Sequence, residues 1–164
     1  MPEVFVAAGS NIRPRAHLRA ALTALAAAWP GLRASRAWSN AAVGFAGDDF
    51  INLVVALDTD EPLAQVQERL KAIEEASGRE RGAKKWAPRT LDLDLLLYGS
   101  LVGQFAGAAL PHADLTGRAH VLGPLVELAP EMRHPVTGET FGALWKKLDH
   151  NAHAMREVSL DEDD

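Results

Sequence analysis

Apolar residues gather in four short stretches of the chain, either as a continuous run or in alternation with polar residues, and both patterns are typical of β-strands. Residues 4–8 form a short apolar run, and a Gly-Ser-Asn turn at residues 9–11 follows it. Residues 32–39 and 50–57 are the next two stretches. The fourth covers residues 91–97, where every odd position is leucine. The pattern therefore predicts four strands, and it places these four leucines on one apolar face.

Apolar residues recur at helical spacing in two segments between these strands. The first segment runs from Pro14 to the Pro-Gly pair at residues 30–31, and the second starts at residues 60–62 and ends before Gly78. Proline is favoured in the first turn of a helix and glycine just after its end. These two segments are therefore predicted to be helices that join the first strand to the second and the third strand to the fourth.

The chain after the fourth strand is predicted to add smaller elements. Residues 101–105 are expected to pair as part of a hairpin, and residues 114–128 are mostly helical with an interruption near the Gly-Pro pair at 123–124. Thr140 is a suitable cap for a last short helix that runs to Lys147.

The β-α-β-β-α-β order of the main elements predicts an α+β protein with a ferredoxin-like fold. In this fold the helices pack on one face of an antiparallel sheet, and here C-terminal helical and hairpin additions follow. We predict a single domain over residues 1–148. Residues 149–164 carry six acidic residues and one arginine, and we expect this acidic tail to be disordered.

The composition is that of a neutral globular body with an acidic end. The net charge of −5 comes from the tail, because the other 148 residues carry 16 acidic and 16 basic side chains. A neutral body argues against nucleic-acid binding, which needs a strongly basic face. The absence of cysteine excludes a disulfide scaffold and fits a reducing compartment. Since the chain has no long apolar run and no signal-peptide pattern, we expect a cytoplasmic protein without membrane contacts. We further expect a monomer or weak homodimer.

Asp92 and Asp94 are the first candidate functional residues, because they share one face of the fourth strand. Their Cα atoms are expected roughly 6.5–7 Å apart, and two carboxylates at that spacing suit a hard cation such as Mg²⁺. A basic cluster just upstream could hold phosphate oxygens, and it comprises Arg79, Arg81, Lys84, Lys85 and Arg89. The combination indicates a Mg²⁺–nucleotide site. The alternative is a half-buried strand with acids on its solvated face, although aspartate is depleted in strands.

Asn52 is the second candidate, because it is an amide within the apolar third strand. A buried amide needs hydrogen-bond partners. A planar ligand with ring nitrogens and an exocyclic amine would supply them, and the alternative is a bond to a nearby loop backbone. Phe50, Asn52, Asp92 and Asp94 line the sheet face that the two helices leave free, so this face is predicted to carry the site once other segments cover it.

Several short motifs occur in order along the chain: Gly9-Ser10-Asn11, Phe50-Ile51-Asn52, Gly78-Arg79, the segment from Trp86 to Asp94, Leu110-Pro111-His112, and Arg118. Together they resemble the 6-hydroxymethyl-7,8-dihydropterin pyrophosphokinase family of folate synthesis. The resemblance covers residues 3–148, nearly the whole body. The Pro-Arg-Thr-Leu-Asp-Leu-Asp sequence at 88–94 is its most specific part.

The resemblance implies transfer of the β,γ-pyrophosphoryl group of ATP to the hydroxymethyl oxygen of the pterin, with release of AMP. It implies four catalytic residues, of which Asp92 and Asp94 bind two Mg²⁺ ions while Arg79 and Arg89 contact phosphate oxygens. The implied ATP site comprises Lys71, Glu74, Arg81, Lys85, Trp86, Leu95, His112 and Arg118. The implied pterin site comprises Asn40, Val43, Gly44, Phe50, Asn52, Trp86 and His120.

The pterin end departs from the family pattern. Residues 40–44 lack the usual proline, and His120 stands where the family usually has an aromatic residue such as Phe. An imidazole can stack on a pterin, but it is smaller and titrates near neutral pH. A divergent paralogue that uses a different or modified pterin-like acceptor is therefore one alternative. A non-catalytic nucleotide- or RNA-binding ferredoxin-like module is another, although 6% aromatic residues and a neutral body argue against it.

Overall fold

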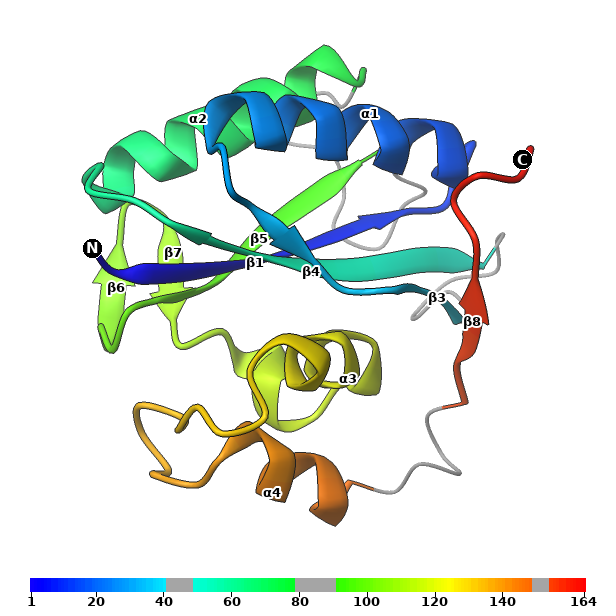
Figure 1. The fold of residues 1–164 in the computed structure, drawn as a ribbon. Helices are drawn as coiled ribbons and strands as arrows, with labels where there is room; N and C mark the ends of the chain where they lie inside the picture. Colours follow the sequence, from blue (N-terminus) through cyan, green and yellow to red (C-terminus); the bar gives the residue numbers. More distant parts are fainter. Residues whose placement is uncertain (41–48, 79–90, 149–153) are drawn as a thin grey trace.

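The structure is a computed structural model, and it describes residues 1–40, 49–78, 91–148 and 154–164. An antiparallel sheet with the strand order β5-β1-β4-β3-β8 forms its centre (Figure 1). Its strands are β1 (Glu3–Ser10), β3 (Ala37–Asn40), β4 (Phe50–Asp58), β5 (Asp92–Tyr98) and β8 (Arg156–Val158), while the short β2 (Arg33–Ala34) pairs with β4. A separate hairpin consists of β6 (Gly103–Phe105) and β7 (Ala108–Leu110).

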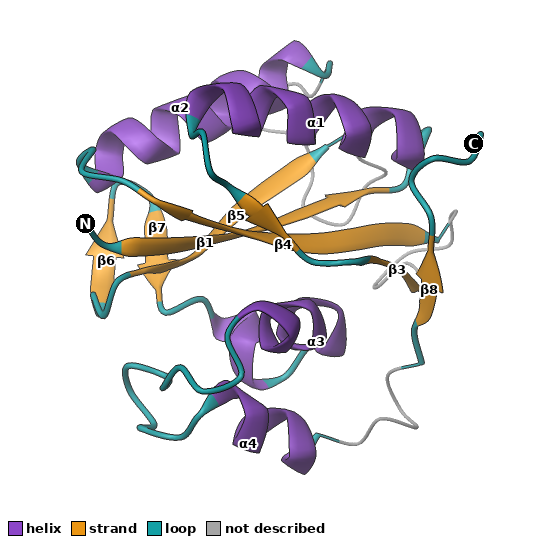
Figure 2. Ribbon diagram, viewed as in Figure 1, coloured by secondary structure: helices purple, strands orange, loops and turns teal. Residues whose placement is uncertain are grey.

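Helices cover both faces of the sheet (Figure 2). The helices α1 (Pro14–Ala28) and α2 (Leu63–Ala76) lie on one face, and α3 (Ala119–Leu128) and α4 (Phe141–Lys147) lie on the other. The first four strands in the order β5-β1-β4-β3, with α1 and α2 together on one face, have the ferredoxin-like arrangement. The predicted fold class is confirmed, and the C-terminal additions provide the second helical layer. No helix in the described ranges is long and apolar enough to span a bilayer.

The predicted second strand is divided into two short pieces, β2 and β3, with Ser35 near the break. The backbone N–H and the side-chain hydroxyl of this serine both form hydrogen bonds with the neighbouring strand β4. Its N–H donates to the carbonyl of Val54 at 2.8 Å, and its hydroxyl accepts from the N–H of Val54 at 2.9 Å. A side chain thus replaces one link of the ladder, and the local alternation alone does not reveal this.

Leu97 lies on the opposite sheet face from the one predicted. The register of β5 against β1 shifts between Phe5, which pairs with Leu97, and Val6, which pairs with Leu95. Leu96 is therefore an extra residue, as in a β-bulge, and the alternation reverses after it. Leu93 and Leu95 pack in the core under α1 and α2, whereas Leu97 packs with Phe5 under α3 and α4.

The helical segment near residue 120 also differs from the prediction. α3 continues through Pro124, and the break falls earlier, at Gly117, which ends a short 3-10 helix η1 (Ala113–Thr116). A proline removes one bond to the carbonyl four residues before it. For Pro124 that carbonyl belongs to His120 in the first turn, so the rest of α3 keeps its hydrogen bonds.

The C-terminal segment is the largest difference from the sequence prediction, because residues 154–164 are not a disordered tail. Residues 156–158 form β8 and pair with β3, and Asp164 accepts hydrogen bonds from the first turn of α1. The composition of this segment gives too little apolar surface for order on its own. The order comes from contacts with residues about 120 to 150 positions earlier in the chain.

Glu61, just before α2, connects the end of α1, the helix α2 and the end of β5. Its Oε1 accepts from the indole N–H of Trp29 at 2.7 Å, and its Oε2 accepts from Nε of Arg69 at 2.8 Å. The hydroxyl of Tyr98 donates to its backbone carbonyl. Burial raises the pKa of Glu61, but the hydrogen bonds from Trp29 and Arg69 outweigh it, so the pKa lies below its ordinary value of 4.5.

Replacing Glu61 with Gln should lower the free energy of unfolding by about 1 kcal/mol at neutral pH, the scale of a partly screened, charge-assisted hydrogen bond. Because the folded-state pKa is lowered, this stabilisation is complete above the unfolded-state value and is lost as pH falls through the folded-state value. Urea unfolding from about pH 7 to about pH 3.5 measures the difference. Glu68→Gln, at an exposed site on α2, is the matched control and should change little. A difference for Glu61→Gln that stays constant with pH would contradict this assignment.

Candidate active site

The floor of the candidate site is a row of residues that crosses three strands. Gly9 of β1 pairs with Asp92 of β5 on one side and with Asn52 of β4 on the other. One step along the same face, Ala7 pairs with Asp94. Neighbouring strands lie about 4.8 Å apart, so Asp92 and Asn52 are about 10 Å apart across the sheet. Because position 9 has no side chain and position 7 only a methyl group, the floor between the two polar ends stays open.

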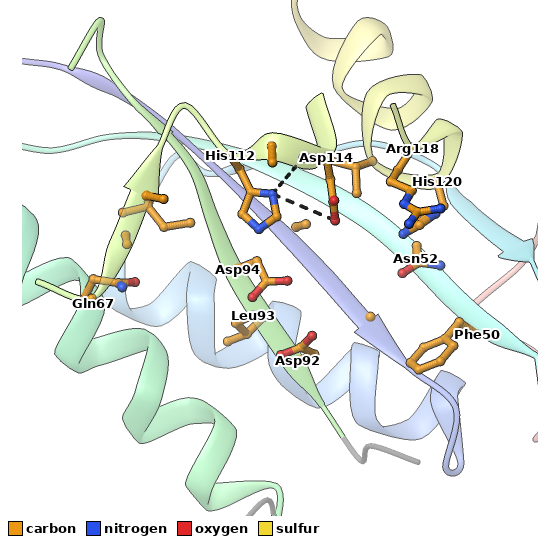
Figure 3. A pocket seen from close by; sticks show the side chains of 18 of the residues that line it. Phe50, Asn52, Gln67, Asp92, Leu93, Asp94, His112, Asp114, Arg118 and His120 are labelled. Atoms are coloured by element: carbon orange, nitrogen blue, oxygen red, sulfur yellow. Dashed lines mark hydrogen bonds and ion pairs between the residues drawn. The ribbon is translucent and has the colours of Figure 1, made fainter. Parts of the chain in front are cut away.

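The segment between β7 and α3 covers this floor (Figure 3). The backbone N–H of His112 donates to the carbonyl of Leu96 at 3.0 Å, which fixes the start of the segment to β5. Asp114 follows in η1, and Arg118 and His120 lie at the start of α3. Side chains from this cover and from the sheet therefore line the same cavity.

The cavity has a volume of about 510 Å³, which is within the usual range for small-molecule sites. It reaches from Phe50 and Asn52 on β4, past the two aspartates of β5, to Gln67 on α2 (Figure 3). The β4 end presents an aromatic ring and side-chain amides, and the β5 end presents carboxylates and an imidazole. This distribution suits two ligands, or one long ligand, with a flat polar part at one end and charged groups near the middle.

The side chain of Asn52 is held by a hydrogen bond on one side and occupies space left by a glycine on the other. Its Nδ2 donates to Oδ1 of Asn40, the last residue of β3. On the other side, a Cβ placed on Gly9 would lie only 2.6 Å from Oδ1 of Asn52. Glycine at position 9 therefore leaves the space that the Asn52 amide occupies. The partner of Asn52 is a strand side chain, and not the loop backbone considered above as an alternative.

His112 is held in a defined orientation above the aspartates. Its Nδ1 accepts from the backbone N–H of Asp114 at 3.1 Å and lies 3.9 Å from Oδ2 of that residue. A ring nitrogen that accepts carries no proton, so the neutral imidazole bears its proton on Nε2. Figure 3 shows the remainder of the ring on the side of Asp94. His112 thus presents an N–H donor of the kind that binds phosphate oxygens.

Asp92 and Asp94 can supply oxygen ligands to a hard cation. Both side chains are half-buried and line the cavity. Within the part of the chain that the structure describes, no group of three or more His, Cys, Asp or Glu is arranged to hold a metal ion. Mg²⁺ commonly binds through one or two carboxylates together with water and substrate phosphates. The pair therefore fits a cation that arrives with a nucleotide.

Nine of the residues predicted for the site line this cavity: Asn40, Phe50, Asn52, Asp92, Asp94, Leu95, His112, Arg118 and His120. Lys71 and Glu74 of α2 are not among its lining residues: the ammonium of Lys71 lies 4.0 Å from Glu68, and Oε2 of Glu74 accepts from the N–H of Leu93 at 2.7 Å. The calls on Val43, Gly44, Arg79, Arg81, Lys85, Trp86 and Arg89 lie outside the described residues. The roles assigned to all of these residues stay predictions.

Ten lining residues escaped the sequence prediction, among them two small residues of the floor, Ala7 and Gly9, and two polar residues, Gln67 and Asp114. The alternation of two small residues on one face of β1 was a readable signal for an open floor. Asp114 follows His112 by two positions, which is the spacing of a local turn contact. For Gln67 the helix pattern gave no signal, because the residue reaches the cavity only through the packing of α2 beside β5.

The fold and the cavity define an α+β protein with a small-molecule site built around a carboxylate pair. The family model for 7,8-dihydro-6-hydroxymethylpterin-pyrophosphokinase (HPPK) matches residues 5–130. A 2-amino-4-hydroxy-6-hydroxymethyldihydropteridine pyrophosphokinase from Pseudomonas aeruginosa is 40% identical over 137 residues, 80% of this chain and 83% of the relative. One from Synechocystis is 37% identical over 150 residues, 90% of this chain and 76% of the relative. The chain belongs to the HPPK family, as the motifs predicted.

Solved structures agree on the fold. A Plasmodium falciparum HPPK-DHPS structure with SDX-DHP has a TM-score of 0.64 and 15% identity, and the match covers 90% of this chain and 43% of that chain. A second solved structure, described as HPPK-DHPS in complex with substrates, has a TM-score of 0.66 and 12% identity over 88% of this chain and 43% of that chain. This chain therefore spans less than half the length of these structures.

Proposed function

We infer that the protein transfers the pyrophosphoryl group of ATP to the hydroxymethyl group of 6-hydroxymethyl-7,8-dihydropterin in folate synthesis. Membership of the HPPK family supports this reaction. The structural observation that carries it is one cavity that joins Asp92 and Asp94 to Phe50 and Asn52. In the reaction the acceptor oxygen bonds to the β-phosphorus of ATP, and the bond from that phosphorus to the α,β-bridging oxygen breaks. AMP leaves, and the hydroxyl proton is released.

The β4 end of the cavity suits the pterin. The ring of Phe50 offers an apolar face, and the Asn52 amide, fixed by Asn40, offers a donor and an acceptor in one plane. A pterin is flat and has ring nitrogens, a carbonyl and an exocyclic amine that match such an amide. Binding here would direct its hydroxymethyl group along the Gly9 floor toward the aspartates.

The β5 end suits the triphosphate. The Nε2–H of His112 is a donor for phosphate oxygens at this end, and the guanidinium of Arg118, which Figure 3 shows beside His120 and Asn52, is a cationic donor on the acceptor side of the cavity. Arg79 and Arg89, predicted as catalytic from the sequence, would add positive charge. Mg²⁺ held by Asp92 and Asp94, predicted as two ions, would offset the negative charge of the phosphates. Since the acceptor carries its own nucleophilic hydroxyl, the protein's task is to position the substrates and stabilise charge.

The nucleotide product tests this function directly. The purified protein is incubated with ATP, Mg²⁺ and 6-hydroxymethyl-7,8-dihydropterin, and the nucleotides are separated by chromatography. AMP that forms only in the presence of the pterin is the expected result. ADP would indicate transfer of a single phosphoryl group and contradict the proposal. Omitting Mg²⁺ tests the metal requirement in the same assay, and activity without any divalent cation would contradict it.

His120 supports a second candidate, the same transfer to a different or modified pterin-like acceptor. Its side chain lines the cavity together with Asn52 and Phe50 (Figure 3), and an imidazole there gives a smaller and more polar wall than a phenyl ring. Comparing a panel of 6-substituted pterins by kcat/KM distinguishes the two candidates. A substituted pterin that exceeds the hydroxymethyl compound by about tenfold, roughly 1.4 kcal/mol, would favour the second.

Gly9→Ala tests the acceptor end without changing any charge. The new methyl group would meet Oδ1 of Asn52 at 2.6 Å, so the amide must move. We expect the KM for the pterin to rise about tenfold, because an orienting hydrogen bond is lost, while the KM for ATP changes little. Gly117→Ala is the matched control, since a Cβ at that position meets nothing within 4 Å. Equal effects on both substrates would contradict this division of the cavity.

A further inference from the structure

Residues 155–164, here named the C-terminal strap, run from β3 to the start of α1 (Figure 1). At one end β8 pairs with β3, with Glu157 opposite Trp38 and Val158 opposite Ala37. In the middle, Val158 and Leu160 pack against the core under α1. At the other end Asp164 reaches α1. One segment therefore connects two elements that lie far apart in the sequence.

Side chains reinforce the β3 end of the strap. Arg36 donates from one terminal nitrogen to Glu157 at 2.8 Å and from Nε to Glu127 of α3 at 3.2 Å. The indole N–H of Trp38 also donates to Glu127 at 2.7 Å, and the Arg36 guanidinium lies 5.0 Å from the centre of the Trp38 ring. The hydrogen bond that Arg36 donates to Glu127, together with the negative charge of that carboxylate, raises the pKa of Arg36, and Glu157 adds a smaller effect in the same direction. β3, α3 and the strap are thus joined by one network.

The α1 end of the strap supplies a cap that α1 lacks locally. The N-cap residue Arg13 makes no side-chain cap hydrogen bond. Instead, the Asp164 carboxylate accepts from the N–H of Arg15 at 2.7 Å and of Ala16 at 3.0 Å. Nε of Arg15 donates to the carbonyl of Ser159 at 2.8 Å, which holds the strap from the side. A carboxylate at a helix N-terminus is stabilising because it satisfies free N–H groups and faces the positive end of the dipole.

Both attachment points of the strap adjoin the acceptor end of the cavity. β3 has only four residues, and its last residue, Asn40, accepts the hydrogen bond from Asn52. α1 begins shortly after β1, whose Gly9 pairs with Asn52 and leaves the space that the Asn52 amide occupies. The strap therefore restrains β3, which bonds the Asn52 amide, and α1, which follows the strand beside it. The two aspartates lie on β5, at the opposite edge of the sheet.

We propose that the C-terminal strap positions the Asn40–Asn52 pair and so sets the affinity for the acceptor, although none of its residues is among those that line the cavity in the described part of the chain. The identity of the acceptor rests on the proposed function. Glu157 and Asp164 act as positioning residues at the two ends. Loosening the strap weakens acceptor binding and leaves ATP binding intact, because β3 is separated from β5 by β4 and β1.

The test compares two charge-matched double variants of the full chain. E157K/D164K opposes Arg36 at one end and removes the cap of α1 at the other. The control E131K/D163K makes the same changes at two exposed acids, Glu131 between α3 and α4 and Asp163 beside the cap. We expect the strap variant to raise the KM for the pterin about tenfold over the control, with the KM for ATP within about twofold. Hydrogen exchange of the amides of residues 37–40 should become about tenfold faster.

Equal rises in both KM values, or a KM for the pterin within about twofold of the control, would overturn the proposal. E157Q/D164N, with E131Q/D163N as its control, gives a milder pair if the lysine variant does not fold, and a smaller shift in the same direction is expected. If the unmodified protein forms no AMP from this pterin, the proposed function fails separately. Hydrogen exchange then decides, since unchanged protection of residues 37–40 in E157Q/D164N overturns the role of the strap.

Discussion

Asp94→Asn should retain the fold and lose turnover by a factor on the order of 10³ or more, the scale of losing a charge contact that acts on transferring phosphates. The substitution keeps the shape of the side chain. It removes a negative charge that would hold the proposed Mg²⁺, and it places an N–H donor beside Asp92 on the same strand face. The rate of AMP formation at saturating substrates measures the effect, and circular dichroism measures the fold.

Asp58→Asn is the matched control for this variant, because Asp58 is an exposed aspartate at the end of β4. Its activity should equal that of the unmodified protein. A titration with Mg²⁺ adds a second readout, since a weakened metal-binding site should raise the concentration of Mg²⁺ that gives the half-maximal rate. Turnover of Asp94→Asn within about tenfold of the unmodified protein at every Mg²⁺ concentration would remove the assignment of Asp94 as a metal ligand.

Phe141→Ala should lower the free energy of unfolding by about 3–5 kcal/mol, the usual cost of emptying a buried phenylalanine site. Phe141 is fully buried in the core between the sheet and α3 and α4, and its ring meets that of His134 edge-on at 5.9 Å. α4 has seven residues, too few for a helix that is stable by itself, so it depends on this packing and on the Thr140 cap. Urea unfolding measures the change.

Val136→Ala is the control for Phe141→Ala, because Val136 is 64% exposed in the turn before α4. Its effect should stay within about 0.5 kcal/mol, as is usual for a surface truncation. A loss below about 1 kcal/mol for Phe141→Ala would show that the layer of α3 and α4 relaxes around the missing ring, and it would contradict the dependence of α4 on this packing.

The parts of the fold that the sequence predicted are those whose contacts repeat locally. Apolar runs and alternation predicted the strands β1, β4 and β5, and helical spacing predicted the helices α1 and α2. The predicted cap at Thr140 is confirmed, because its hydroxyl accepts from the N–H of Ala143. Leu97 was misplaced because a single extra residue reverses alternation, and the pattern of leucines is the same on both sides of it. β8 was missed because its partners, Arg36 and the strand β3, lie about 120 positions earlier in the sequence.

The candidate site shows the same division. Asp92, Asp94 and Asn52 were readable because polar residues in apolar strands need a reason. Their distance from one another across the sheet depends on the register with Gly9, which no local pattern contains. The orientation of His112 likewise depends on a backbone N–H two residues later. Residue types thus indicated the chemistry, and the pairing of strands determined which groups could reach the same ligand.

The outer strands of the sheet also bear on how the protein behaves at high concentration. An exposed strand edge is a template on which another chain can add by backbone hydrogen bonds. On β5, the N–H of Leu93 is bonded by Glu74 and the carbonyl of Leu96 by His112. On β3, the three-residue β8 occupies the corresponding edge. The same contacts that shape the two ends of the cavity therefore protect the sheet from strand-to-strand aggregation.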